Sequence, residues 1–175
     1  MVDNMKWKKV ESIFAESKEL LGNPDIKLVR PSEWKKITNN SLGNFWGKAD
    51  YQHRIITIGK YTKRSVPQVR NTVIHEIAHL IFCKPIKKKG LEPIASCKGE
   101  AFTLQEMKEV ERITYRSTKP HWWIECFADK IARTNFKSRW TQKYNKSNRM
   151  LPKREVLIEM AKESIKKYGY EEKNQ

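Results

Sequence analysis

Two histidines and a glutamate lie within five consecutive residues, His75-Glu76-Ile77-Ala78-His79. On an α-helix, residues four apart share one face, so His75 and His79 can offer ring nitrogens to the same metal ion. Zinc favours such neutral nitrogen ligands. Glu76 follows His75 directly and can reach a water molecule on that metal as a base. The pattern H-E-x-x-H therefore predicts a catalytic zinc (Zn²⁺) site with Glu76 as the catalytic base.

The alternative is a chance pair of histidines on an ordinary helix. The flanking residues are apolar and indicate a buried helix: Val73, Ile74, Ile77, Ala78, Leu80 and Ile81. Burying two histidines and a glutamate in such surroundings is costly unless they have partners, and a bound metal removes that cost. The metal site is therefore the favoured interpretation.

A catalytic zinc usually has three protein ligands and a water, so another element must supply the third ligand. The favoured candidate is Glu125, in the segment Glu125-Cys126-Phe127-Ala128-Asp129. Glu125 and Asp129 are again four residues apart and share a helix face. Glu125 can then bind zinc while Asp129 accepts a hydrogen bond from the second ring nitrogen of His75, which fixes the tautomer of a metal-bound histidine.

Other histidines and tyrosines are alternatives for parts of this site. His121 lies four residues before Glu125, so it is an alternative third ligand or a donor to the oxyanion that forms during hydrolysis. Tyr115 and Tyr61 are further candidates for that donor, and their spacing does not distinguish them. His53 is expected on a strand surface rather than at the metal.

The elements that position these residues follow from hydrophobic periodicity and from helix-breaking residues. Helices are predicted at Met5–Leu21, from Pro67 to Phe82 or Cys83, and at Gly99–Thr114, His121–Asn135 and Glu155–Tyr168. Strands are predicted at Ile26–Val29, Asn44–Tyr51 and Arg54–Ile58, with a turn or short helix from Ser32 and a basic loop at Lys84–Pro93.

These elements predict a single α+β domain over residues 1–175, with a core at about 44–135 and a basic helical extension at about 136–170. The strands at Asn44–Tyr51 and Arg54–Ile58 are expected to pair with each other. We expect Arg54–Ile58 to form the sheet edge, where an extended substrate could add as a further strand.

Composition points to an anionic partner. The chain of 175 residues has 36 Lys and Arg against 20 Asp and Glu, a formal net charge of +16. Such a charge favours nucleic acid or an acidic protein, although it also suits a solubilising surface. No apolar run is long enough for a membrane span, and the N-terminus lacks a signal-peptide pattern, so a cytoplasmic protein is expected.

The strongest basic segment is Phe136–Arg154, which contains no acidic residue. Its basic side chains with interleaved aromatics can grip a nucleic-acid backbone and stack on bases. The candidate contacts are Lys137, Arg139, Trp140, Lys143, Lys146 and Arg149. The alternative for the aromatics, which recur at every fourth residue, is a hydrophobic core stripe.

The two motifs together resemble those of gluzincin-type zinc metallopeptidases. HEIAH at 75–79, followed by E-x-x-A-D-x-x-A at 125–132, is most similar to the small ImmA/IrrE-type peptidases. This resemblance, over roughly residues 44–132, implies a zincin-like domain in which a short sheet packs against the metal-binding helices. It implies Glu125 as the third zinc ligand and Asp129 as the acid that supports a zinc-bound histidine.

One departure from the family concerns spacing. Glu125 lies 46 residues after His79 (125 − 79), longer than is usual for the family, and Gly99–Thr114 resembles an inserted lid helix. Val69–Glu76 is also similar to SprT-like proteases, which act on DNA–protein crosslinks and use a third histidine. Their zinc ribbon is absent here, because Cys83, Cys97 and Cys126 cannot supply one.

Two classes of function therefore stay open. The favoured one is a zinc metallopeptidase that hydrolyses a peptide bond in a specific intracellular protein. The alternative is a nucleic-acid-binding or DNA-associated regulatory module, SprT-like or catalytically inactive, that uses the basic surface. Glu76 favours the peptidase, because a structural metal site has no use for a base at that position.

Overall fold

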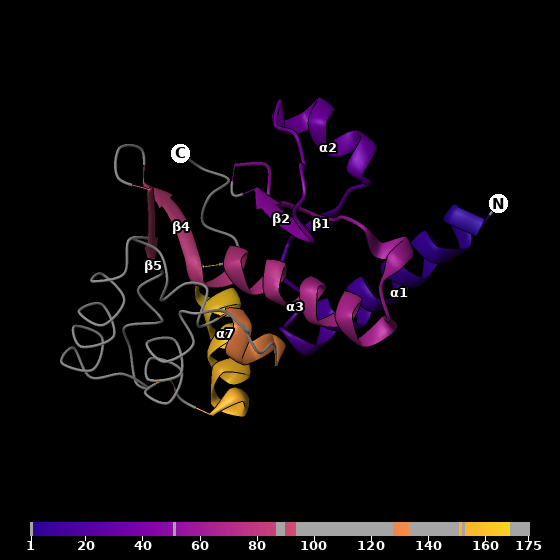
Figure 1. Ribbon diagram of the computed structural model, residues 1–175. Coiled ribbons are helices and arrows are strands. Elements are labelled where there is room, and N and C mark those ends of the chain that lie inside the picture. The colour runs from indigo at the N-terminus through magenta and orange to yellow at the C-terminus, as the bar shows by residue number, and fades with distance from the viewer. Residues whose placement is uncertain are drawn as a thin grey trace, which may run out of the picture.

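The computed structural model describes residues 2–50, 52–86, 90–93, 128–133, 151 and 153–168. Over these residues the chain combines a small three-stranded sheet with helices, in agreement with the predicted α+β class. Figure 1 shows helix α3 (Val66–Phe82) crossing the centre of the molecule, with the sheet on one side and α7 (Arg154–Tyr168) on the other. Helix α3 therefore contacts both halves of the described structure.

The sheet contains β1 (Lys27–Leu28), β2 (Gly47–Asp50) and β3 (Ile55–Ile58), in the order β1-β3-β2. Strands β2 and β3 pair with each other, as the sequence predicts, and they do so antiparallel with Gly47 opposite Ile58. Strand β1 pairs with β3 in parallel. The expectation that 54–58 forms the sheet edge is wrong, because β3 lies between β1 and β2, which are the two edge strands of the described sheet.

Two helices precede and follow the first strand. Helix α1 (Val2–Leu20) is the predicted N-terminal helix and buries Val10, Ile13 and Ser17 on one face. Helix α2 (Pro31–Thr38) begins with a proline at its first position, and the Glu33 carboxylate accepts a hydrogen bond from the Arg30 backbone N–H at 3.1 Å.

A 3-10 turn, η1 (Tyr61–Lys63), leads into α3. The side chain of Gln68 accepts a hydrogen bond from the backbone N–H of Ser65 at 3.0 Å, just before the first turn of α3. This side-chain cap satisfies a backbone donor where the helix begins. Pro67 lies in the first turn, as predicted, where its missing N–H has no intrahelical acceptor to lose.

The predicted basic loop after α3 is instead a β-hairpin. Strands β4 (Cys83–Ile86) and β5 (Gly90–Pro93) pair antiparallel, with Cys83 opposite Pro93. The basic residues at 87–89, which connect the two strands in the sequence, lie outside the described part of the chain. The predicted helix at 99–114 also lies outside it.

One hydrophobic cluster joins α1, the sheet, α3, the segment 128–132 and α7. Its fully buried members include Ile13, Ile56, Ile58, Val73, Ile77, Ile131 and Leu157. Arg154 Nε donates to the Ile131 carbonyl at 2.7 Å and ties the start of α7 to this cluster. Within the part of the chain that the structure describes, no helix is both long and apolar enough to cross a membrane.

Candidate metal centre

The C-terminal half of α3 holds the two histidines of the motif with their rings turned toward each other. The Nε2 atoms of His75 and His79 lie 2.9 Å apart, and the rings meet edge-on with centroids 4.6 Å apart. Two nitrogens bound to one tetrahedral zinc at ordinary bond lengths lie about 3.3 Å apart. The observed separation is about 0.4 Å shorter and is also that of a hydrogen bond between the rings, so both nitrogens lie near enough to each other to share one metal ion.

A carboxylate from a distant part of the sequence holds the first histidine. His75 Nδ1 lies 2.9 Å from Asp129 Oδ1, and the Asp129 side chain is only 4% exposed. If Nδ1 carries the proton and donates it to Asp129, the lone pair of His75 lies on Nε2, facing His79. The structure thus brings together His75 and Asp129, the pair for which the sequence predicts this hydrogen bond.

Glu76 is buried against the edge strand. Its side chain is 8% exposed, on the helix that carries both histidines. A Cβ atom built on Gly47 would lie 2.6 Å from Glu76 Oε1 and 2.8 Å from its Cγ. Strand β2 can approach the carboxylate this closely only because residue 47 has no side chain. Sequence reasoning missed Gly47, although a glycine inside a strand is a general signal of close approach.

Arg64 and Thr72 adjoin this contact. Thr72 is one helical turn before Glu76, and its Cγ2 would lie 2.7 Å from the same built Cβ of Gly47. The Arg64 Nη2 atom donates to Thr72 Oγ1 at 2.7 Å, and its guanidinium carbon lies 4.5 Å from the centre of the Trp46 ring. Burial lowers the pKa of Arg64 from its ordinary value. No pattern in the sequence singles out Arg64.

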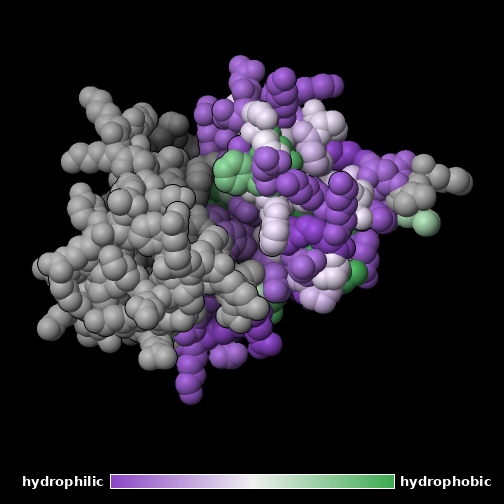
Figure 2. Space-filling view, in the orientation of Figure 1, coloured by the Kyte–Doolittle hydropathy of each residue, from purple (hydrophilic) through white to green (hydrophobic). Residues whose placement is uncertain are grey.

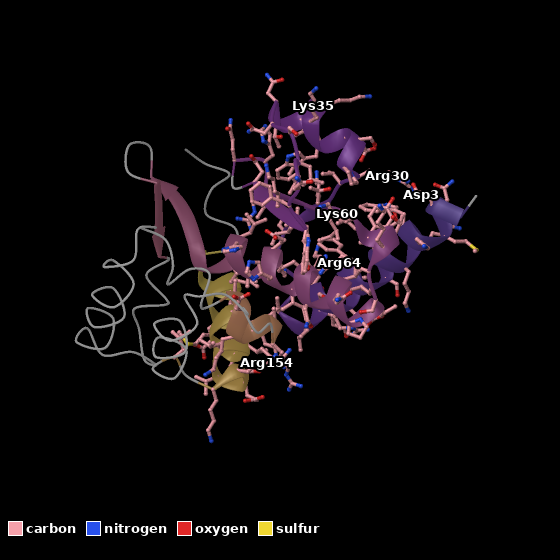
Figure 3. All side chains as sticks on the ribbon, in the orientation of Figure 1. Asp3, Arg30, Lys35, Lys60, Arg64 and Arg154 are labelled. Carbon is pink, nitrogen blue, oxygen red and sulfur yellow. The ribbon has the colours of Figure 1, made fainter. Side chains whose placement is uncertain are left out.

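Two of the candidate residues are engaged elsewhere. The Tyr61 hydroxyl donates to Asp3 at 2.8 Å, and its ring packs edge-on against Trp7. Asp3 lies near the N-terminal end of α1, away from the end of α3 that joins β4 (Figures 1 and 3). His53 lies in the turn after β2 and contacts Asp50 at 2.8 Å, which agrees with its expected place on the surface. The described geometry therefore gives neither residue a role beside the histidine pair.

Both candidates for the third ligand, Glu125 and His121, fall outside the described residues. Tyr115, a candidate donor to the oxyanion, also falls outside them. The predicted nucleic-acid contacts also fall outside them: Lys137, Arg139, Trp140, Lys143, Lys146 and Arg149. Among the residues that are described, no group of three or more His, Cys, Asp or Glu side chains is arranged to hold a metal. His75 and His79 are thus the two predicted zinc ligands that the structure describes, together with Glu76 and Asp129 beside them.

Comparisons with known proteins add no relative. The chain matches no family model, and it has no significant match among curated proteins or solved structures. The resemblance to gluzincins accordingly rests on the two sequence motifs alone.

Proposed function

We propose that the protein is a zinc-dependent metallopeptidase with a zincin-like catalytic centre on α3. The observation that carries this proposal is the convergence of His75 Nε2 and His79 Nε2 at 2.9 Å, with Asp129 on the far nitrogen of His75. Without a metal, the lone pair that Asp129 directs toward His79 can accept a hydrogen bond from His79 Nε2; with a metal, the same orientation presents that lone pair as a ligand. A metal-binding pair gains both orientation and ligand basicity.

His75, His79 and Glu125 would hold the zinc, which when bound supplies a Lewis acid to the attacking water and the scissile carbonyl. Glu76 takes the proton from that water as its oxygen attacks the carbonyl carbon, and then delivers it to the leaving amine. Its burial against Gly47 limits the positions open to the carboxylate. Asp129 keeps His75 in the tautomer that binds metal through Nε2.

The edge of β2 is the proposed docking place for an extended substrate. The Gly59 N–H donates to the Trp46 carbonyl at 2.9 Å, which makes these residues a hydrogen-bonded pair of the antiparallel ladder. Backbone groups alternate in direction along such a strand. The N–H and C=O groups of Gly47 and Ala49 therefore point away from β3, toward the side where a substrate strand can pair beside Glu76.

Metal content is the first test of this proposal. Protein purified without chelators should contain about one zinc ion per chain, and His79→Ala should contain almost none. Glu125→Ala and His121→Ala then assign the third ligand, because only the variant that lacks a ligand loses the metal. Wild-type protein that binds no zinc under these conditions would reject the proposed site.

The base is tested separately with Glu76→Gln, which keeps the size of the side chain and removes its ability to accept a proton. This variant should keep its zinc and lose proteolysis by several orders of magnitude. A proteome-derived peptide library, read by mass spectrometry, offers many candidate substrates at once. Cleavage at the wild-type rate by Glu76→Gln would eliminate the mechanism.

A further inference from the structure

Arg64 is fixed in place on one side and lacks acceptors on the other. Its Nη2 atom donates to Thr72 Oγ1 and to the Gln68 carbonyl, each at 2.7 Å. Its Nε and Nη1 atoms are also buried, yet they find no acceptor among the described residues. No described acidic side chain forms an ion pair with it. A buried cationic group with missing hydrogen bonds carries a desolvation cost that an incoming anion would offset.

An exposed aromatic ring covers this guanidinium. Trp46 stacks over Arg64 and remains 58% exposed, and its neighbour Phe45 is 61% exposed with Lys48 Nζ 4.6 Å from the centre of its ring. The backbone beneath the two rings is tightly held, because a Cβ atom on Gly59 would lie 2.6 Å from the Phe45 carbonyl oxygen. The backbone is thus closely packed while both rings are exposed to solvent. A change of the Trp46 side-chain rotamer can therefore uncover Arg64 without unfolding β2.

The position of Arg64 links it to the catalytic glutamate. Thr72 accepts its hydrogen bond, and Thr72 and Glu76 both contact Gly47 at the edge of the sheet. Figure 3 shows Arg64 between β2 and α3, and Figure 2 shows that the described part of this face is largely hydrophilic. A chain that pairs with the edge of β2 would therefore pass close to Arg64.

We propose that Arg64 and Trp46 form a subsite that binds the carboxylate of an Asp or Glu residue in the protein substrate. This inference rests on the proposed peptidase function and adds a class of substrate to it. A guanidinium donates to a carboxylate through charge-assisted hydrogen bonds, and the Trp46 ring excludes water from them. A peptide suits the place better than a nucleic acid, because only a peptide can also pair with the outward backbone groups of Gly47 and Ala49.

Binding to an array of short peptides tests the subsite independently of cleavage. The array carries extended sequences that differ only by Asp or Glu against Asn or Gln at one position, and the probe is the Glu76→Gln protein, which cannot consume them. Acidic peptides should bind about tenfold or more tightly than their amide counterparts. Adding Arg64→Gln should abolish that difference.

Two further variants provide the controls. Arg70→Gln removes an equal charge from the neighbouring helix α3, at a residue whose guanidinium contacts Glu16 at 2.8 Å, and it should leave the preference intact. Arg64→Lys keeps the charge while losing the planar donor set, so it should keep only part of the preference. If thermal melting shows that Arg64→Gln does not fold, Arg64→Lys takes its place: a reduced preference for acidic peptides supports the subsite, and an unchanged preference rejects it.

Equal binding of acidic and amide peptides by Glu76→Gln would overturn the subsite, and so would a preference that survives Arg64→Gln. Binding of an oligonucleotide through Arg64, with no binding of acidic peptides, would overturn it as well. The proposed function is judged apart from this by wild-type cleavage of the peptide library. Cleavage without a preference for acidic peptides would support the peptidase function and reject the subsite. Binding of acidic peptides by a protein that has neither zinc nor cleavage activity would support the subsite and reject the peptidase function.

Discussion

A single methyl group added to the edge strand should displace the carboxylate of Glu76, the proposed catalytic base. In Gly47→Ala the new Cβ would lie 2.6 Å from Glu76 Oε1 and 2.7 Å from Thr72 Cγ2. Ordinary contacts between heavy atoms need about 3.5 Å, so the carboxylate or the strand must move by about 1 Å. Gly47 does not have a positive φ angle, so alanine suits its backbone and the effect comes from the side chain alone.

The size of the effect on catalysis follows from this displacement. A misplacement of about 1 Å in a reacting group can lower the rate about 100-fold. Overpacking of this kind also costs about 1–3 kcal/mol of folding stability. The three atoms nearest to the new Cβ belong to Glu76 and Thr72 and not to His75 or His79, so the zinc content should stay near the wild-type value. Gly47→Ala should therefore lose activity while remaining folded and metal-loaded.

The assay compares initial cleavage rates on a peptide library with zinc content and melting temperature measured on the same samples. Gly43→Ala is the matched control: its φ of 59° makes alanine strained, while the nearest atom to the new Cβ, Phe45 Cδ2, is 3.8 Å away. That variant should lose about 1 kcal/mol of stability and keep its rate once folded. Wild-type rate and stability in Gly47→Ala would refute the packing of Glu76 against β2.

Three other expectations follow from the structure and the sequence. Asp129→Asn should weaken zinc binding about 10- to 100-fold, measured by competition with a chelator, because His75 loses its charged acceptor; unchanged affinity would contradict that role. Burial and the hydrogen bond to an aspartate raise the pKa of Tyr61, so its contribution to stability is full below about pH 10 and is lost above it. Tyr61→Phe should accordingly make the alkaline loss of melting temperature less steep, and an identical pH profile would count against this contribution. If the basic segment binds nucleic acid, reversing Lys143 and Lys146 to Glu should lower both the affinity and its salt dependence, and no DNA or RNA binding at low salt would end that hypothesis.

Local pattern predicts most of the described elements. The helices at α1, α3 and α7 follow from apolar residues at helical spacing, and β3 follows from its β-branched residues, which come directly after a polar turn. The prediction of the sheet edge is wrong because the edge depends on β1 pairing with β3 across 28 residues of sequence (55 − 27). No local signal specifies such a long-range parallel contact.

The hairpin after α3 illustrates a different limit. Its two strands contain two prolines and the residues between them are basic, so propensity favours a loop. The pairing of β4 with β5 adds backbone hydrogen bonds between the strands, which the strand propensity of single residues does not include. Arg64 shows the same limit at the site, because its importance arises only where Trp46, Thr72 and the start of α3 meet.

The burial of polar groups on α3 indicates why the motif and its distant partner belong together. Thr72, Glu76 and His79 are each at most 8% exposed on a helix whose other buried residues are apolar. Each polar group there lowers stability unless a partner compensates, and Asp129 is an acid that is itself 3% exposed. The partner of Asp129 is His75, whose side chain is 16% exposed; an isolated acid in that interior would be costly, whereas the contact with His75 at 2.9 Å compensates it. The local motif thus depends for its stability on a carboxylate more than fifty residues away (129 − 75 = 54), and losing either partner should disturb the fold as well as the site.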